Sequence, residues 1–429
     1  MKNTDDINGR AILVGLEKKG APRSWTVQDS LEELGKLALT AGLSVADTTY
    51  QKLVHPDPST YVGKGKVEEL KSLVAAMDAG YLIFDEELSP GQQRKLEKHL
   101  GSGVRILDRT RLILDIFSSH AHTREGKLQV ELAQYQYLLP RLSGMRADLE
   151  QQVGGSVAGP VGLRGPGETQ LELDRRQVRR SIQKLKADIE LVRAQRSRSR
   201  VQRGKSGLPV ISLVGYTNAG KSSLLNALTG AGVLVEDKLF ATLDPTTRRL
   251  SLPGGRQALL TDTVGFIRKL PHDLVAAFRA TLEGIQEASL VLHVVDASHP
   301  RALDQIAAVE SVLTNLGVIE TPRLIVWNKV DLLPPGVNPP ALPPSHPECV
   351  AVSAKTAANL NMLLEKADGM LAEELVGMEL FIPWDSYKTV SGLYGQGTIE
   401  EREETDEGVR MKVSVPAALA ARLAQFEKK

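Results

Sequence analysis

Cysteine is nearly absent from this sequence, and so is any excess of charge of one sign. A single cysteine, Cys349, among 429 residues excludes internal disulfides and thiolate-rich metal sites. The 53 lysines and arginines nearly balance the 52 acidic residues, which leaves a net charge of +1. This balance predicts no polyanion-binding surface by itself, so such a surface would require basic residues concentrated in one part of the chain.

Long apolar runs are missing as well. The sequence has no apolar N-terminal leader and no run of about 18 apolar residues, so we expect a soluble, cytoplasmic chain without a membrane span. Cys349 lies in the short apolar run Glu348–Val352, which predicts a small core residue rather than a reactive thiol. The length favours about three domains.

One glycine-rich stretch organises the rest of the chain. Residues 215–222 fit the pattern G-x-x-x-x-G-K-[S/T], with an apolar strand predicted before them and a helix after them, as a phosphate-binding loop requires. Backbone N–H groups of such a loop bind phosphate oxygens, its lysine reaches the β- and γ-phosphates, and its serine binds Mg²⁺. The candidate phosphate-binding residues are Gly215, Tyr216, Thr217, Asn218, Ala219, Gly220, Lys221 and Ser222.

Two candidate switch segments follow. A threonine of the first segment would bind Mg²⁺, and we choose Thr242, with Thr246 and Thr247 as alternatives. The second segment contains D-x-x-G, in which Asp262 would hold Mg²⁺ through water and the Gly265 N–H would contact the γ-phosphate. His272 is a weaker candidate near that phosphate. The first segment is Phe240, Ala241, Thr242, Leu243 and Asp244, and the second is Asp262, Thr263, Val264, Gly265 and Phe266.

Two more motifs indicate a guanine base. In N-K-x-D, the aspartate carboxylate accepts hydrogen bonds from two guanine N–H donors that adenine does not offer in that arrangement. The candidate base-binding residues are Asn328, Lys329, Val330, Asp331, Ser353, Ala354 and Lys355. Five motifs in this order, each at a predicted strand end, predict a guanine-nucleotide site at the edge of a parallel sheet.

The flanking regions predict further domains. Residues 1–120 alternate strand and helix patterns, with strands expected over 10–15, 81–84 and 104–107, so we expect an α/β domain with a largely parallel sheet. The G domain should span residues 207–375. Residues 376–429 should form a small α+β domain, with a hairpin around a turn at 406–408 and a helix from about Pro416.

Residues 121–206 carry two heptad-like apolar series. One series begins at Leu128 and the other at Leu171, and glycines and prolines are frequent between them, over 143–169. We therefore expect a long antiparallel helical hairpin with a glycine-rich loop at its tip. The second helix is strongly basic, and because the chain is neutral overall we favour nucleic-acid contact over a merely solvated charged face. The candidate RNA-binding residues are Arg175, Arg176, Arg179 and Arg180.

Taken together, these motifs resemble the HflX family of ribosome-associated GTPases. The resemblance covers nearly the whole chain, and its most specific parts are residues 165–176, 240–248 and 262–272. It implies a P-loop GTPase domain that hydrolyses GTP to GDP with Mg²⁺, slowly unless ribosomes stimulate it. It also implies a monomer that binds the rRNA and proteins of the large ribosomal subunit. Family members split stalled or idle ribosomes, notably under heat stress, with the glycine-rich loop near the peptidyl-transferase region.

Two other functions fit the same motifs. One is a GTPase that assists ribosome assembly or RNA modification, which would bind immature subunits or tRNA. The other is a non-ribosomal, protein-binding switch whose hairpin is a coiled coil with a solvated basic face. Salt-dependent co-sedimentation with mature large subunits would distinguish the three.

Overall fold

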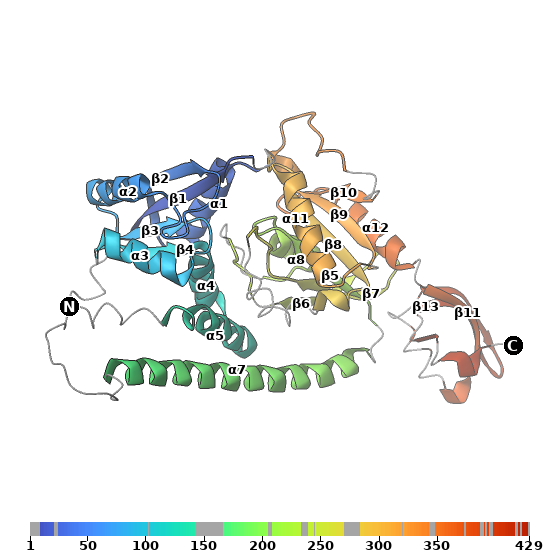
Figure 1. Cartoon of the computed structure of the whole chain (residues 1–429). Coiled ribbons are helices and arrows are strands. Elements are labelled where there is room, and N and C mark those ends of the chain that lie inside the picture. Colours follow the sequence, from blue (N-terminus) through green and yellow to red (C-terminus); the bar gives the residue numbers. More distant parts are fainter. Residues whose placement is uncertain are drawn as a thin grey trace. The chain divides into compact units, whose positions relative to one another are not determined.

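The computed structural model forms two compact units. It describes all residues except 1–8, 21–24, 102, 143–165, 205–207, 233–238, 244, 270–283, 320, 343–347, 373–374, 387–389, 391–392, 394–397, 417–418, 421–422 and 428–429. Unit 1 comprises Met1–Val192 with two short later segments, Lys238–Phe240 and Lys269–Phe278, and unit 2 comprises the rest of the chain. Each unit is considered by itself below (Figure 1).

Unit 1 contains a four-stranded sheet. The strand order is β2-β1-β3-β4 and every pairing is parallel, which confirms the prediction of a parallel α/β sheet. The strands are β1 (Arg10–Lys18), β2 (Ser44–Leu53), β3 (Tyr81–Phe84) and β4 (Arg105–Asp108). The sequence did not predict β2, because this edge strand is half-exposed and lacks an apolar run.

Four helices accompany this sheet: α1 (Val27–Thr40), α2 (Lys64–Met77), α3 (Pro90–Leu100) and α4 (Arg109–His120). Apolar residues of α2 and α3 pack with Ile12 and Val14 of β1 in one core. The hydroxyl of Ser89 caps α3 and Pro90 is its first residue, a pairing that favours the start of a helix. α4 begins directly at the end of β4, so Arg109 starts at the carboxyl edge of the sheet.

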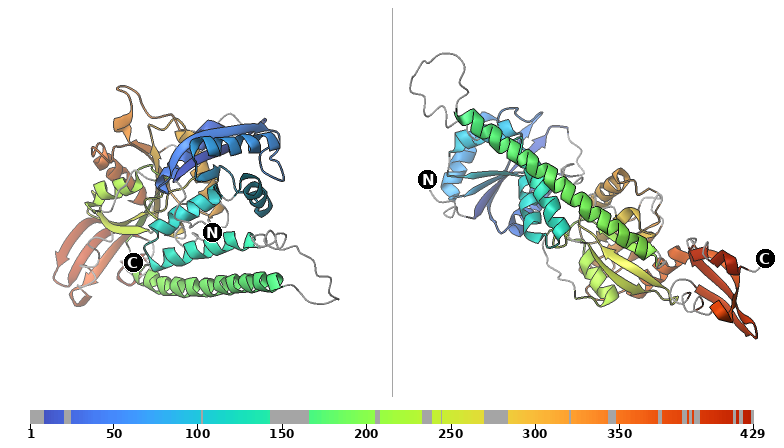
Figure 2. Two further views of the ribbon diagram at one scale, coloured as in Figure 1. Left: turned by 90° about the vertical axis from the view of Figure 1, so that its left-hand side faces the viewer. Right: turned by 90° about the horizontal axis from the view of Figure 1, so that it is seen from below.

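The predicted pair of helices is present as α5 (Arg124–Leu138) and α7 (Pro166–Gly204). Figure 2 shows them side by side, and Leu132 of α5 packs with Leu185 and Ile189 of α7. The prediction placed residues 166–169 in the glycine-rich loop, and this was wrong, because α7 begins at Pro166. Proline is favoured at the first helical position, where its missing N–H costs nothing. The rest of the expected loop, 143–165, lies outside the described residues.

Unit 2 contains a six-stranded sheet of order β10-β9-β8-β5-β7-β6, with all pairs parallel except β6 and β7. Its strands are β5 (Val210–Gly215), β6 (Thr246–Ser251), β7 (Gln257–Asp262), β8 (Leu290–Asp296), β9 (Arg323–Asn328) and β10 (Cys349–Ala351). The accompanying helices are α8 (Lys221–Thr229), α11 (Ala302–Asn315), the short η3 (Val330–Leu332) and α12 (Leu360–Ala372). The carboxyl ends of the parallel strands therefore meet at one edge.

Two single residues of this sheet, Cys349 and His293, differ in exposure. Cys349 is exposed, so its prediction as a core residue was wrong. It begins the edge strand β10, in which side chains alternate between faces and the next residue, Val350, is the buried one. His293 of β8 is 1% exposed and its Nδ1 lies 3.3 Å from the Glu310 carboxylate, so it is a core histidine with a partner.

The C-terminal part of unit 2 is a small three-stranded antiparallel sheet with its own core. Its elements are β11 (Leu375–Pro383), η4 (Trp384–Ser386), β12 (Thr398–Thr405), β13 (Gly408–Pro416) and η5 (Ala424–Phe426). The predicted hairpin is confirmed. The predicted helix does not start at Pro416, because β13 extends through that residue. No helix among the described residues is long and apolar enough to cross a membrane.

The contact between α5 and α7 gives a test of the helical pair. Leu185 is 6% exposed in that contact, and Leu→Ala changes at buried positions cost about 2–5 kcal/mol. We expect Leu185→Ala to reduce the opening free energy of α7 by about 2 kcal/mol or more, measured by hydrogen exchange of its amides. The neighbouring Lys184→Ala, at an exposed position of the same helix, should change it by no more than about 0.5 kcal/mol. Equal protection in both variants would show that the pair is not held by this core.

Candidate nucleotide-binding site

The loop between β5 and α8 turns tightly against the neighbouring strands. Gly215 ends β5 with a φ of 152°, and a Cβ there would lie 2.1 Å from the Val294 carbonyl oxygen of β8. Gly220 caps α8 with a φ of 90°, and a Cβ there would lie 2.3 Å from Nδ2 of Asn328. Only glycine fits these two positions, because a side chain would meet backbone or a buried amide. The close approach leaves backbone N–H groups at the start of α8, which suits a phosphate.

Lys221 is the first residue of α8 and is 6% exposed. Its ammonium donates hydrogen bonds to the carbonyl oxygens of Gly215 (3.2 Å) and Tyr216 (2.9 Å). The pKa of Lys221 is lowered from its ordinary 10.5 to about 8, mainly by burial and to a smaller extent by the nearby Lys329, against the opposing effect of Asp262. The site thus has a buried cation that an anionic ligand would stabilise.

Three oxygen-bearing side chains from three segments meet beside this lysine. The hydroxyl oxygens of Ser222 and Thr242 are 2.7 Å apart, and the Ser222 hydroxyl donates to Oδ2 of Asp262 at 2.6 Å. The other carboxylate oxygen of Asp262, Oδ1, is buried and has no hydrogen-bond partner within the part of the chain that the structure describes. Burial raises the pKa of Asp262, against the opposing effects of Lys221 and both hydroxyls. Hydroxyl and carboxylate oxygens are the protein ligands that Mg²⁺ prefers, so the cluster fits this ion.

The alternative threonines lie elsewhere. Thr246 and Thr247 are in β6, and the Thr247 hydroxyl pairs with that of Thr261 at 3.0 Å. Of the three candidate threonines, Thr242 is therefore the one whose hydroxyl lies next to that of Ser222. Asp244 of the first switch segment lies outside the described residues, and so does the alternative candidate His272.

The second switch segment pairs with the phosphate-binding loop through its backbone. The Thr217 N–H donates to the Phe266 carbonyl at 2.7 Å, and the Phe266 N–H donates to the Gly215 carbonyl at 3.1 Å. A Cβ on Gly265 would lie 2.7 Å from Cα of Thr217, so glycine is required there. Thr263 is buried and its hydroxyl donates to the Leu213 carbonyl. Phe266 is 3% exposed and Val264 is also buried, so no side-chain amide or carboxylate extends from either position.

The predicted base-binding residues come together at the ends of β9 and β10. Nδ2 of Asn328 donates to the Ala219 carbonyl at 2.9 Å, and its Oδ1 accepts from the Ala354 N–H at 3.0 Å. The Ser353 hydroxyl donates to Oδ1 of Asp331 at 2.6 Å. Asn328 therefore braces the phosphate loop against the last motif, and Ser353 orients the Asp331 carboxylate. Lys355 is exposed, and Val330 begins the short helix η3.

One residue of this region was not predicted. Asp296 ends β8, and its carboxylate lies 2.8 Å from the ammonium of Lys329, whose backbone is left-handed with a φ of 62°. This ion pair fixes the direction of the Lys329 side chain beside the base-binding residues. The available signal was an aspartate directly after the apolar strand 290–295, the same pattern that identified Asp262 and Asn328.

The candidate RNA-binding arginines lie on α7. Arg176, Arg179 and Arg180 are exposed, and Arg175 is partly exposed. Among them, Arg176 forms a long ion pair of 3.8 Å with Glu172, one turn away. Such exposed pairs contribute little, so these side chains remain available to another partner.

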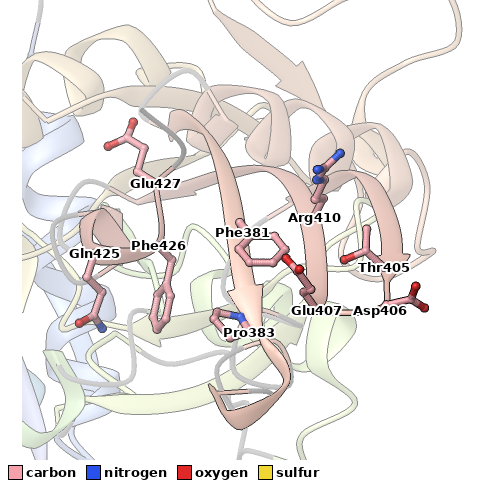
Figure 3. A pocket seen from close by; sticks show the side chains of 9 residues that line it. All are labelled: Phe381, Pro383, Thr405, Asp406, Glu407, Arg410, Gln425, Phe426 and Glu427. Atoms are coloured by element: carbon pink, nitrogen blue, oxygen red, sulfur yellow. The ribbon is translucent and has the colours of Figure 1, made fainter.

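A separate pocket of about 750 Å³ lies in the C-terminal sheet (Figure 3). The side chains of Phe381, Arg410 and Phe426 line it together with the turn between β12 and β13. None of its lining residues belongs to the nucleotide motifs.

Comparison with known proteins finds matches over most of the chain. Family models match in three consecutive regions: a GTP-binding GTPase N-terminal region over residues 28–118, a GTP-binding GTPase middle region over 120–203, and a 50S ribosome-binding GTPase over 210–329. The GTPase HflX of Caldanaerobacter subterraneus is 45% identical over 417 residues, covering 97% of this chain and 93% of that protein. The GTPase HflX of Escherichia coli K12 is 42% identical over 403 residues, covering 93% and 92%.

The buried Lys221 predicts a pH dependence of nucleotide binding. Phosphate charge would raise the lysine pKa again, so at and above the free-state value of about 8 binding must take up a proton. Affinity for GTP should be flat below that pH and should fall above it, approaching about tenfold per pH unit. Titration calorimetry in two buffers of different ionisation enthalpy would show proton uptake at pH 8.5 and little at pH 7. The Lys221→Arg variant, whose guanidinium stays charged, should show none from this position. Equal proton uptake in parent and variant would exclude Lys221 as the source.

Proposed function

The chain belongs to the HflX family of GTPases, and from this premise we propose that it binds the large ribosomal subunit and splits or recycles stalled or idle ribosomes, particularly under stress. GTP binding would control when the basic helix α7 and the segment before it are placed on the subunit. The 50S ribosome-binding description of the family model for residues 210–329 supports the choice of partner. The basic face of α7 supports RNA as the surface that it contacts.

The meeting of Ser222, Thr242 and Asp262 is the observation that carries the nucleotide chemistry. We assign Ser222 and Thr242 as direct Mg²⁺ ligands and Asp262 as a ligand through water, which would give the unpartnered Oδ1 a hydrogen-bond donor. Held by these residues, Mg²⁺ would supply positive charge that neutralises negative charge developing on the phosphates during hydrolysis. Residues 215–222 would cradle the phosphates, with Lys221 reaching them from the start of α8.

The same geometry supports guanine over adenine. Asp331 is held by Ser353, so its carboxylate is oriented for the two N–H donors of guanine. Asn328 holds Ala219 and Ala354, which keeps the phosphate and base parts of the site in register. Lys329, directed by Asp296, would cover one face of the base.

Hydrolysis should be slow without a partner. Phe266 occupies the position after D-x-x-G, where a glutamine orients the attacking water in GTPases such as Ras, and a buried phenyl ring cannot do this. For Ras the unassisted rate is on the order of 10⁻⁴ s⁻¹ and a partner accelerates it about 10⁵-fold. We propose that the large subunit provides or orders the missing group here.

Replacing the base-binding carboxylate tests the guanine assignment. Asp331→Asn exchanges an acceptor for a donor, and a buried group left unpaired costs about 1–3 kcal/mol. We expect the variant to bind GTP about 10-fold or more weakly and to prefer xanthosine triphosphate, measured by competition titration. Asp385→Asn, in the C-terminal part, is the matched control and should leave both affinities unchanged. An Asp331→Asn protein with parental GTP affinity would refute the assignment.

Mature large subunits test the proposed partner. We expect single-turnover GTP hydrolysis to accelerate by at least about 100-fold when subunits are added, a fraction of the factor known for assisted GTPases. Light scattering of intact ribosomes should fall when the protein and GTP are added. Binding to immature subunits or tRNA alone would favour assembly or RNA modification, and no RNA binding at all would favour the protein-binding switch.

The arginines of α7 provide a matched comparison within the same experiment. The variant changes four arginines together to Gln: Arg175, Arg176, Arg179 and Arg180. The slope of log K for subunit binding against log salt concentration should become less steep by roughly 0.7–0.9 for each phosphate contact that is lost. Nucleotide affinity should stay at the parental value. The control changes four basic residues that are exposed elsewhere in unit 1, namely Lys36, Lys71, Lys98 and Arg105. Equal salt slopes in the two variants would identify the α7 face as merely solvated.

A further inference from the structure

The first switch segment begins in unit 1, and the second is followed within three residues by a segment of unit 1. Phe240, two residues before Thr242, and Lys269, four residues after Gly265, belong to unit 1, whereas Ala241 and Arg268 belong to unit 2. The chain therefore passes from one unit to the other immediately beside each switch. The contacts of these two residues within unit 1 fix the two crossing points.

Phe240 is held in an apolar contact. Its side chain is 2% exposed, and its ring lies edge-on to that of Phe117 of α4, with centroids 4.7 Å apart and an interplanar angle of 72°. The preceding residue, Leu239, is also buried, and its N–H donates to the Thr40 hydroxyl at the end of α1 at 3.3 Å. Edge-to-face aromatic pairs of this kind contribute about 0.5–1.5 kcal/mol beyond their burial.

Lys269 is held by charge. Its ammonium lies 2.5 Å from Oδ2 of Asp85 and 3.0 Å from the Glu86 carboxylate, directly after β3. It also donates to the Ser30 hydroxyl at 3.1 Å. Asp85 is 2% exposed, and its other oxygen, Oδ1, accepts from the buried Arg109 at 2.7 Å. The carboxylate is thus fixed from both sides, and it can hold Lys269 in one position.

The backbone at both crossing points is strained. Phe240 and Lys269 have φ angles of 59° and 56°, in the left-handed region that residues with a side chain seldom adopt. Such conformations cost of the order of 1–3 kcal/mol and persist only where surrounding contacts impose them. The contacts with Phe117 and Asp85 are among those that hold these two residues, so they oppose relaxation of the backbone at both crossing points.

We propose that Phe117 and Asp85 are positioning residues for GTP hydrolysis: by holding Phe240 and Lys269, they keep both switches in the arrangement that binds the γ-phosphate and its metal. In that arrangement Thr242 meets Ser222, and Gly265 lies against Thr217. GDP has no γ-phosphate and does not need either contact. The anchors should therefore favour GTP over GDP, and by linkage GTP should strengthen the anchors to the same degree. The inference rests on the metal role proposed above for Thr242.

The test measures the affinity ratio for a non-hydrolysable GTP analogue and GDP in the full chain. We expect Lys269→Gln to weaken binding of the GTP analogue about tenfold, which is within the usual range of coupling between sites. The same change should alter GDP affinity less than about twofold. Lys269→Arg, which keeps the charge, should restore the parental ratio. Phe117→Leu should also lower the affinity for the GTP analogue relative to that for GDP. In an Asp85→Asn background, Lys269→Gln should have a smaller effect on this ratio than in the parent, because only the contacts of Lys269 with Glu86 and Ser30 remain to be lost.

The matched control is Lys52→Gln, which removes another ion pair of unit 1, with Glu17 at 3.0 Å, away from the switch segments. It should leave both affinities unchanged. An equal loss of affinity for both nucleotides in Lys269→Gln would show a general structural effect and would overturn the inference. Unchanged affinity for both nucleotides would overturn it as well.

Thr242→Ala distinguishes failure of this inference from failure of the proposed site. If Thr242→Ala leaves Mg²⁺-dependent analogue binding intact, the metal assignment itself is wrong. If it weakens binding while Lys269→Gln and Phe117→Leu leave the ratio at the parental value, the site stands and only the positioning role falls.

Discussion

A buried ammonium and a buried carboxylate that influence each other electrostatically are the constraint on which the nucleotide site depends. Lys221 and Asp262 are 6% and 0% exposed, and removing charges from water is costly unless partners compensate them. The compensation within the chain is partial, because burial still lowers the pKa of Lys221 and raises that of Asp262, and Oδ1 of Asp262 has no hydrogen-bond partner. A polyphosphate with its Mg²⁺ would supply charge of both signs, which gives the proposed ligand a physical basis.

The site is built mainly by backbone held at short range. Gly215, Gly220 and Gly265 each lie where a Cβ would overlap a neighbouring segment. These close approaches bring β8, β9 and the second switch segment against one loop. Side chains then fix the register, with Asn328 bonding to Ala219 and Ala354. The site thus combines the carboxyl edge of the sheet with two switch segments whose residues contact the phosphate-binding loop.

The ends of those switch segments give unit 1 a role beyond folding. Its parallel sheet ends in charged residues at the carboxyl edge of β3 and β4, and Asp85 and Arg109 neutralise each other there in a buried pair. Breaking such a pair is strongly destabilising, so the carboxylate is a fixed point rather than a mobile surface charge. Lys269 is bound to that fixed point. The proposed positioning role follows from this arrangement.

The sequence by itself determined the motifs and the strands that carry them. Glycines at fixed spacing, apolar runs before Asp262 and Asn328, and the seams of α5 and α7 are local patterns, and the structure confirms the elements they predicted. Tertiary structure decided what depends on residues distant in the chain. It placed Thr242 rather than Thr247 beside Ser222, paired Asp296 with Lys329, and exposed Cys349 at a sheet edge. It also placed Phe240 and Lys269 in unit 1. Local spacing cannot specify such contacts, because they form only when separate strands and helices pack together.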